Sequence, residues 1–278
     1  MKKINRRSFL AAAGLTAAAL ALTACGGSAS STASSAASSA ASSEAASTSA
    51  AAELTTVEAG KLTMATNAAF PPYEMTTDAG EFEGIDIDTA KAIAEKLGLE
   101  LQIDDMDFDA ALLSVQQGKA DIVMAGVTVT DERKAVMDFS DSYATGIQSI
   151  IVPEGSDITS PDDLAGKKIG TQRGTTGYIY CSDDFGDDAV VAYDNGLTAV
   201  QALNNGQVDA VVIDNAPAKE FVAANPGLVI LDTSYAEEDY AIGLAKGSAL
   251  EDAVTAALEE LKADGTLQSI VDKYITAE

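Results

Sequence analysis

Short apolar runs alternate with amphipathic segments along most of the chain. A short apolar run predicts a buried strand, whereas apolar residues spaced by three and four positions predict one face of a helix. In segment 86–97, Ala90, Ile93 and Leu97 share such a face. Gly98 follows directly, and glycine is the usual residue just after a helix end. The pattern therefore predicts a helix over residues 86–97, with a strand on either side of it.

The predicted elements follow one another in a regular order. Strands are expected at 62–66, 99–103, 121–124, 167–171, 190–193, in a buried run ending at 214, and at 240–244. Helices are expected at 86–97, 108–117, 197–204, 250–263 and 266–274, with further helix starts after residues 130, 160 and 216. Strand–helix–strand units of this size predict parallel sheets with right-handed crossovers, so the expected fold class is α/β.

An internal repeat indicates two similar lobes. The segment 115–123 (VQQGKADIV) matches 203–211 (LNNGQVDAV), and each reads as a helix end, a glycine and an aspartate that opens a buried strand. A chain that leaves the first lobe near 143–147 and returns near 236–240 would form a two-strand hinge with a cleft beside it. We therefore predict two doubly wound lobes: lobe 1 from residues 58–143 and 238–278, and lobe 2 from residues 144–237.

The N-terminus predicts export and a lipid anchor. Residues 1–24 combine basic residues with an apolar run that is too short for a stable membrane span. The sequence LTAC, followed by two glycines, resembles a bacterial lipobox in which Cys25 becomes the acylated first residue. Arg6 and Arg7 also resemble a twin-arginine signal, and the general secretory route stays open. We expect a protein held at the extracellular face of the cell membrane.

Residues 25–57 are expected to form a tether, because this Ser- and Ala-rich tract offers too little apolar surface to fold. The chain holds 43 acidic and 17 basic residues and has a net charge of −26. Loss of residues 1–24, which contain four basic and no acidic residues, makes this −30. So acidic a surface repels nucleic acid and favours a monomer.

Residues suited to metal or hydrolytic chemistry are scarce. The chain has no histidine and only two cysteines, Cys25 and Cys181. Cys181 is expected to be a small buried apolar residue. The acidic stretch around Asp105 and Asp107 lacks the spacing and central glycine of a calcium loop, so we expect a solvated edge. We predict no metal site and no cofactor.

The segment 125–140 (AGVTVTDERKAVMDFS) is the expected centre of function. Thr130 suits a helix N-cap, and Asp131 and Glu132 suit the first turn. Arg133 then occupies the third helical position, where a capping box has Glu or Gln. A guanidinium there is poorly placed for the helix but well placed to hold a carboxylate against the exposed amides. The alternative is a solvated surface arginine.

Several motifs together resemble the extracellular solute-binding proteins for polar amino acids, which serve ATP-binding-cassette (ABC) importers. They are GIDID at 84–88, ATNAAFPPYE at 65–74, and the segments 126–140, 170–177 and 209–214. Thr89 departs from the family signature, which has an aliphatic residue there. The resemblance extends from residue 62 to the C-terminus. It implies a periplasmic-binding-protein-like fold of type II and a partner permease.

The family resemblance implies how the two ends of an amino acid are held. Arg133 would grip the α-carboxylate, helped by Thr128 and Thr175. Asp214 would take the α-ammonium, with the Gly126 carbonyl as second acceptor. A zwitterion that leaves water needs both charges paired, and groups from both lobes would couple binding to closure. As an alternative, Asp214 only caps the helix that follows it.

The resemblance also implies a side-chain site. Phe70 and Phe108 would sandwich the ligand side chain, unless both are ordinary core residues. Asn67 stands where binders of lysine and arginine carry an acid, which disfavours a cationic ligand. Gln172 and Ile213 stand where glutamine binders carry Lys and His. An uncharged polar or sulfur-containing amino acid is therefore expected, and the acidic surface disfavours an anionic one.

Two other functions stay open. Periplasmic dehydratases of prephenate-like acids resemble these binding proteins, and Glu74 and Arg173 are candidates for such a reaction. A tethered sensor that docks to a receptor is the second alternative. The expected ammonium site at Asp214 favours amino-acid binding over catalysis, and Arg173 is expected to face solvent.

Overall fold

The computed structural model describes residues 54–275. The predicted signal segment 1–24, the predicted lipidation site Cys25 and nearly all of the predicted tether lie outside the described residues. Within 54–275, no helix is long and apolar enough to cross a membrane.

One nine-stranded sheet runs through these residues in the order β5-β1-β6-β12-β7-β10-β8-β9, and β11 also pairs with β7. Its strands are β1 (Lys61–Thr66), β5 (Glu100–Asp105), β6 (Ile122–Val123), β7 (Met137–Pro153), β8 (Ile169–Gln172), β9 (Val190–Tyr193), β10 (Ala210–Asp214), β11 (Leu228–Ile230) and β12 (Ala236–Ala245). A small second sheet contains β2 (Ala69–Phe70), β3 (Glu74–Thr76) and β4 (Phe82–Glu83).

The helices alternate with the strands, as the sequence pattern predicts. They are α1 (Ile85–Leu97), α2 (Phe108–Gln116), α3 (Asp131–Val136), α4 (Thr176–Phe185), α5 (Gly196–Asn204), α6 (Asn215–Ala224), α7 (Glu251–Ala263) and α8 (Thr266–Tyr274). The predicted α/β class is confirmed. Helix α4 was not predicted, and the helix expected after residue 160 is only the 3-10 turn η1 (Pro161–Leu164).

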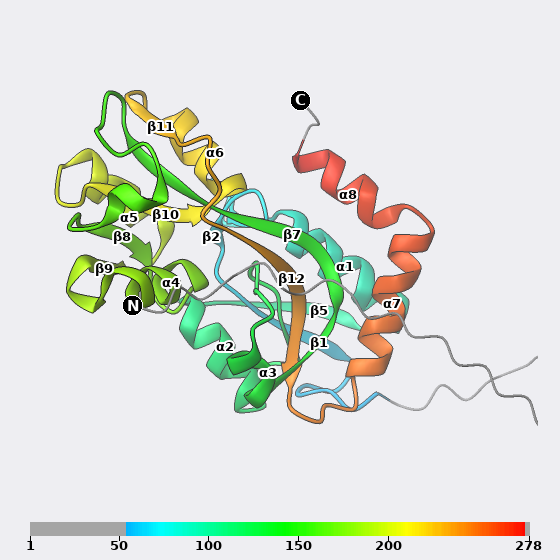
Figure 1. Cartoon of the computed structure of the whole chain (residues 1–278). Helices are drawn as coiled ribbons and strands as arrows, with labels where there is room; N and C mark the ends of the chain where they lie inside the picture. The colour runs from blue at the N-terminus through cyan, green and yellow to red at the C-terminus, as the bar shows by residue number, and fades with distance from the viewer. Residues whose placement is uncertain (1–53, 276–278) are drawn as a thin grey trace, which may run out of the picture. The chain divides into compact units, whose positions relative to one another are not determined.

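Strands β7 and β12 connect the two lobes. They lie side by side and antiparallel, from Ala236 opposite Gln148 to Ala245 opposite Met137 (Figure 1). At one end β12 pairs with β6, and at the other end β7 pairs with β10 and β11. The predicted two-strand hinge is therefore the middle of two long strands. Because neither strand is interrupted there, the lobe boundaries at 143/144 and 237/238 stay predictions.

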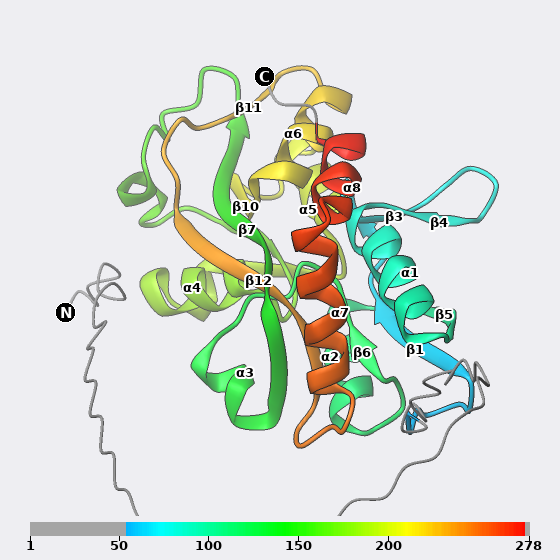
Figure 2. The ribbon, with the colours of Figure 1, turned by 90° about the vertical axis from the view of Figure 1, so that its right-hand side faces the viewer.

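The C-terminal helices pack on lobe 1. Helices α7 and α8 both pack against α1 (Figure 2), and their apolar residues join one core cluster with those of β1 and β12. At the surface, Lys96 of α1 reaches Glu260 of α7 (3.1 Å), and Asp88 of α1 pairs with Lys273 of α8 (2.7 Å). Helix α2 contributes to a second cluster with β6, and α4, α5 and α6 contribute to the two clusters of lobe 2.

Candidate ligand-binding site

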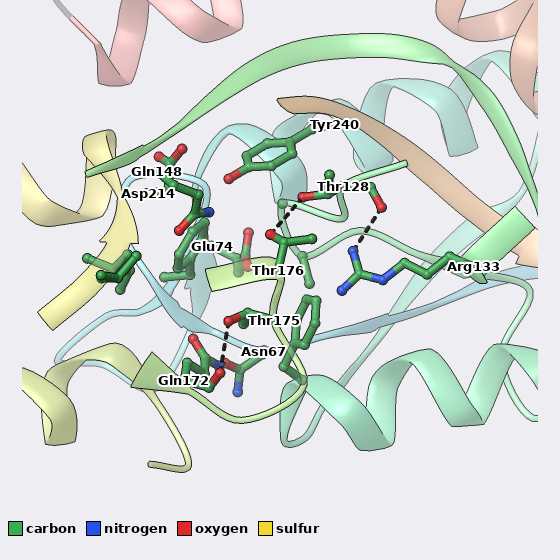
Figure 3. Close-up of a pocket in the computed structure, with 16 residues that line it drawn as sticks. Asn67, Glu74, Thr128, Arg133, Gln148, Gln172, Thr175, Thr176, Asp214 and Tyr240 are labelled. Carbon is green, nitrogen blue, oxygen red and sulfur yellow. Dashed lines mark hydrogen bonds between the residues drawn. The ribbon is translucent and has the colours of Figure 1, made fainter. Parts of the chain in front are cut away.

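A pocket lies between the two lobes, beside the hinge strands. It is lined by Asn67, Phe70, Glu74, Phe108, Ala125, Gly126, Thr128, Arg133, Gln148, Gln172, Thr175, Thr176, Val212, Ile213, Asp214 and Tyr240. Every residue predicted to bind the ligand is among them. In Figure 3, Arg133 and Asp214 lie on opposite sides of this pocket.

Arg133 reaches the pocket from the short helix α3. Thr130 caps this helix by accepting a hydrogen bond from the Arg133 backbone N–H (3.2 Å). The guanidinium donates to the carbonyl of Thr128 (2.8 Å) and, across the lobes, to that of Gly174 (3.2 Å). Because Arg133 is only 8% exposed, the alternative of a solvated surface arginine is wrong. A guanidinium has five N–H donors, so several are left for a ligand.

Two threonine hydroxyls face each other next to Arg133. Those of Thr128 in lobe 1 and Thr176 in lobe 2 lie 3.4 Å apart (Figure 3). The predicted residue Thr175 also lines the pocket, but its hydroxyl caps α4 and donates to the carbonyl of Gln172 (2.8 Å). Thr176 is therefore better placed than Thr175 to offer a hydroxyl. The sequence offers a Thr-Thr pair here without indicating which member faces inward.

Asp214 ends β10 and also caps helix α6. Its carboxylate accepts from the backbone N–H groups of Ala216 (2.9 Å) and Ile147 (2.7 Å). Asp214 thus caps the helix, as the alternative required, but it also lines the pocket, so that capping is not its only possible role. Burial raises the pKa of Asp214 to about 6, although the two backbone donors oppose this rise.

Gly126 has φ +55°, in the left-handed region that favours glycine. A Cβ atom at this position would lie 2.8 Å from the ring of Phe70 and 3.2 Å from that of Tyr240. The Gly126 N–H donates to Asp86 (3.0 Å). The loop backbone can therefore approach the pocket only because residue 126 has no side chain.

A pair of amides connects the lobes at the other side of the site. Gln172 donates to the side-chain oxygen of Asn67 (2.8 Å), and Asn67 donates to the carbonyl of Met106 (2.9 Å).

Phe70 stacks on Tyr73 with ring centroids 5.7 Å apart. The Phe108 ring lies 5.4 Å from the Arg133 guanidinium carbon. Both phenyl rings also belong to core clusters, so the core alternative is correct in part.

Glu74 is a pocket residue that sequence reasoning considered only for a dehydratase. It is completely buried, and its carboxyl group lies close to that of Asp86, so that the two groups can share one hydrogen-bonded proton. Burial, reinforced by neighbouring Asp86, raises the pKa of Glu74 well above its usual range. Asp86 accepts from Tyr143 (2.8 Å), and burial raises its pKa to about 6. Glu74 in the pocket wall and Asp86 beside it thus form a pair of carboxyl groups that favour retaining a proton.

The hinge strands supply further residues that the sequence did not indicate. Gln148 of β7 and Tyr240 of β12 line the pocket, and Gln148 donates to the carboxylate of Glu238 (2.9 Å). Tyr240 packs edge-on against Tyr73, with ring centroids 5.5 Å apart. Alternation along a strand identifies buried positions but does not reveal which of them face a cavity.

The residues expected outside the site lie outside it. Arg173 is exposed and approaches Asp194 (3.7 Å), as predicted, and Cys181 is buried in the core of lobe 2. The acidic stretch lies at the edge strand β5 and just after it, where Asp105 accepts from the Ala68 N–H (2.8 Å). Within residues 54–275, no group of three or more His, Cys, Asp or Glu residues could hold a metal ion.

Comparison with known proteins gives a consistent result. Residues 62–277 match the model of the bacterial extracellular solute-binding proteins, family 3. A probable histidine-binding protein of Neisseria gonorrhoeae is 33% identical over 99% of this chain and 98% of its own length. The L-cystine-binding protein of Escherichia coli K12 is 32% identical over 80% of this chain and 85% of its own. An ancestral arginine-binding protein bound to glutamine is 43% identical, with a TM-score of 0.75 over 78% of this chain and 99% of that one.

Proposed function

Because the chain belongs to the bacterial extracellular solute-binding proteins, family 3, and is an amino-acid-binding component of an ABC transporter, we propose that it captures a free L-amino acid in the pocket between its lobes. It then delivers this ligand to the permease subunits of the importer. The observation that carries the proposal is the placement of Arg133 and Asp214 on opposite sides of one pocket.

The main-chain end of the ligand fits these groups. Arg133 would bind the α-carboxylate, with the hydroxyls of Thr128 and Thr176 and the first N–H groups of α4 around it. Asp214 and the Gly126 carbonyl would bind the α-ammonium. Charge-assisted hydrogen bonds of this kind offset the cost of taking both ligand charges out of water.

The side-chain end has two candidates. The neutral amide pair of Asn67 and Gln172 supports the uncharged polar or sulfur-containing amino acid predicted from the sequence. A cationic side chain is the second candidate, because the buried carboxyl group of Glu74 also lines the pocket. A guanidinium would supply both a counter-charge and donors. The names of the relatives span both classes, with histidine, cystine, arginine and glutamine.

A panel of L-amino acids in a thermal-shift assay tests the proposal. One or two ligands should raise the melting temperature in a concentration-dependent way, because they bind only the folded protein. The Glu74→Gln variant then separates the two candidates. It should weaken arginine binding more than tenfold but change the affinity for an uncharged ligand little. A panel without any stabilising amino acid would refute the proposal.

The rival functions have less support. The family consists of solute-binding proteins, and a dehydratase needs groups for two carboxylates. Arg173, which was considered together with Glu74 for such a reaction, is exposed and does not line the pocket. Steady consumption of a bound ligand would point to catalysis instead.

We also propose that acylated Cys25 tethers the exported protein to the outer face of the cell membrane and that the protein acts as a monomer. The lipobox-like LTAC sequence supports the anchor, and the strongly acidic composition supports the monomer. Cys25→Ser should release the protein from the membrane fraction.

A further inference from the structure

A further buried carboxylate lies beside the expected site of the ligand carboxylate. Glu238 of the hinge strand β12 is 5% exposed. Its Oε2 atom accepts from the Thr128 hydroxyl (3.1 Å) and from the Gln148 amide (2.9 Å). Its Oε1 atom has no hydrogen-bond partner in residues 54–275. The pocket residue Thr128 is therefore already engaged by an anion that belongs to the protein.

The hydroxyl protons of Thr176 and Thr128 form a chain of hydrogen bonds that ends at Glu238. Thr128 has one hydroxyl proton, and in this arrangement it goes to the carboxylate. In the contact of 3.4 Å between the two threonine hydroxyls, Thr176 must then be the donor. The result is a chain from Thr176 through Thr128 to Glu238, in which each hydrogen bond strengthens the next. A ligand carboxylate at the same place needs these protons for itself.

Arg133 and Glu238 both bind Thr128, Arg133 at its carbonyl and Glu238 at its hydroxyl. The two hydrogen bonds of the Arg133 guanidinium go to carbonyl groups, and it forms no direct ion pair with a carboxylate of the described residues. Burial lowers the pKa of Arg133, and among the nearby charges Glu238 opposes this shift most. Since both groups hydrogen-bond to Thr128, Glu238 is a negative charge close to the buried guanidinium.

We propose that Glu238 is an internal competitor of the ligand α-carboxylate for Thr128 and Arg133, and that it sets the affinity below what the pocket would otherwise reach. The inference rests on the proposed function only for the identity of the ligand group at Arg133. A bound α-carboxylate places a second anion next to Glu238, and like charges in a buried site repel each other. This repulsion favours release of the ligand.

Glu238→Gln tests the proposal in the full-length protein, because glutamine keeps the shape and an acceptor oxygen but removes the charge. Isothermal titration calorimetry with L-arginine should show binding about tenfold tighter than in wild type, the order expected for removing a nearby buried charge. L-Argininamide, which lacks the anionic carboxylate, should change less than twofold. The exposed neighbour Glu237→Gln is the matched control and should change neither value beyond twofold. Unchanged or weaker L-arginine binding, or equal changes for both compounds, would overturn the proposal.

A second experiment needs no ligand. The stabilities of Arg133→Met, Glu238→Gln and the double variant are compared with wild type by urea denaturation. The double variant should be less destabilised than the sum of the two single variants, because each single variant leaves one buried charge without its partner. Additive effects would overturn the role of Glu238 as counter-charge. If no amino acid binds the wild type, the proposed function fails, whereas this cycle still decides the role of Glu238.

Discussion

At the scale of single residues, the most informative sequence signal was a residue in the wrong place for its helix. Arg133 stands where a capping box has Glu or Gln, and the structure places it in the pocket, where its guanidinium donates to carbonyl groups of both lobes. Glu74 gave no comparable signal, because a buried carboxyl group looks like a surface acid in the sequence. Thr176 and Gln148 were missed because their chemistry depends on which way an unremarkable polar residue faces.

Arg133→Ala should weaken amino-acid binding at least 100-fold, since losing one partner of a buried charge pair costs about 3 kcal/mol. The far-ultraviolet circular dichroism spectrum should stay native, because α3 is a short surface helix. Isothermal titration calorimetry measures the affinity. Arg173→Ala is the control, because it also removes an arginine but from an exposed position. Equal affinities for the two variants would exclude Arg133 from the site.

At the scale of elements, periodicity predicted most strands and helices to within a few residues. Helix α4 was missed because its sequence TGYIYCSDDF mixes aromatic and acidic residues without a clear apolar face. The sequence predicts where along the chain the hinge lies, but not how its two segments pair. The structure shows that the two segments that cross between the lobes pair with each other, as parts of β7 and β12. Strands that pair although they lie far apart in the sequence leave no local pattern that would predict the pairing.

The close contact between β7 and β12 at Gly146 gives a prediction about stability. A Cβ atom at this position would overlap the ring of Tyr240. Gly146→Ala should therefore destabilise the protein by about 1–3 kcal/mol, the usual cost of overpacking. Urea denaturation measures this cost. The loss of stability caused by Gly146→Ala should be smaller in a Tyr240→Leu background, where the ring is absent. An equal loss in that background would show that the ring does not cause it.

At the scale of the whole molecule, the two-lobed plan followed from the repeat at 115–123 and 203–211 and from the family motifs. What the sequence could not give is the distribution of buried acids. Asp214, Asp86 and Glu74 are brought together from segments far apart in the chain, and their raised pKa values arise from burial that only the assembled fold creates.

These acids predict how stability and binding depend on pH. Because the folded protein raises the pKa of Asp214 and Asp86 to about 6, their neutral forms favour folding below about pH 4, and this contribution is lost as the pH rises through 6. Thermal denaturation of the ligand-free protein should therefore show falling stability between pH 4 and 7 from these groups.

Ligand binding should show the opposite trend. The α-ammonium binds the ionised form of Asp214, so affinity should fall about tenfold for each pH unit below about 6. The ligand-induced rise in melting temperature should consequently grow from pH 5 to pH 7.5. Asp214→Asn should bind weakly at every pH and lose this dependence. A wild-type affinity that is constant from pH 5 to 7.5 would contradict the assignment of Asp214.

The long antiparallel pairing of β7 with β12 has a mechanical consequence. Both strands continue from one lobe into the other, and their irregularities fall between Tyr240 and Ala241 and between Ala241 and Gly243. Any rotation of the lobes must be taken up as torsion spread along this ribbon, without separating its strands. The resistance of these two strands to twisting therefore opposes lobe rotation. Ligand affinity then depends on this resistance as well as on the contacts in the pocket.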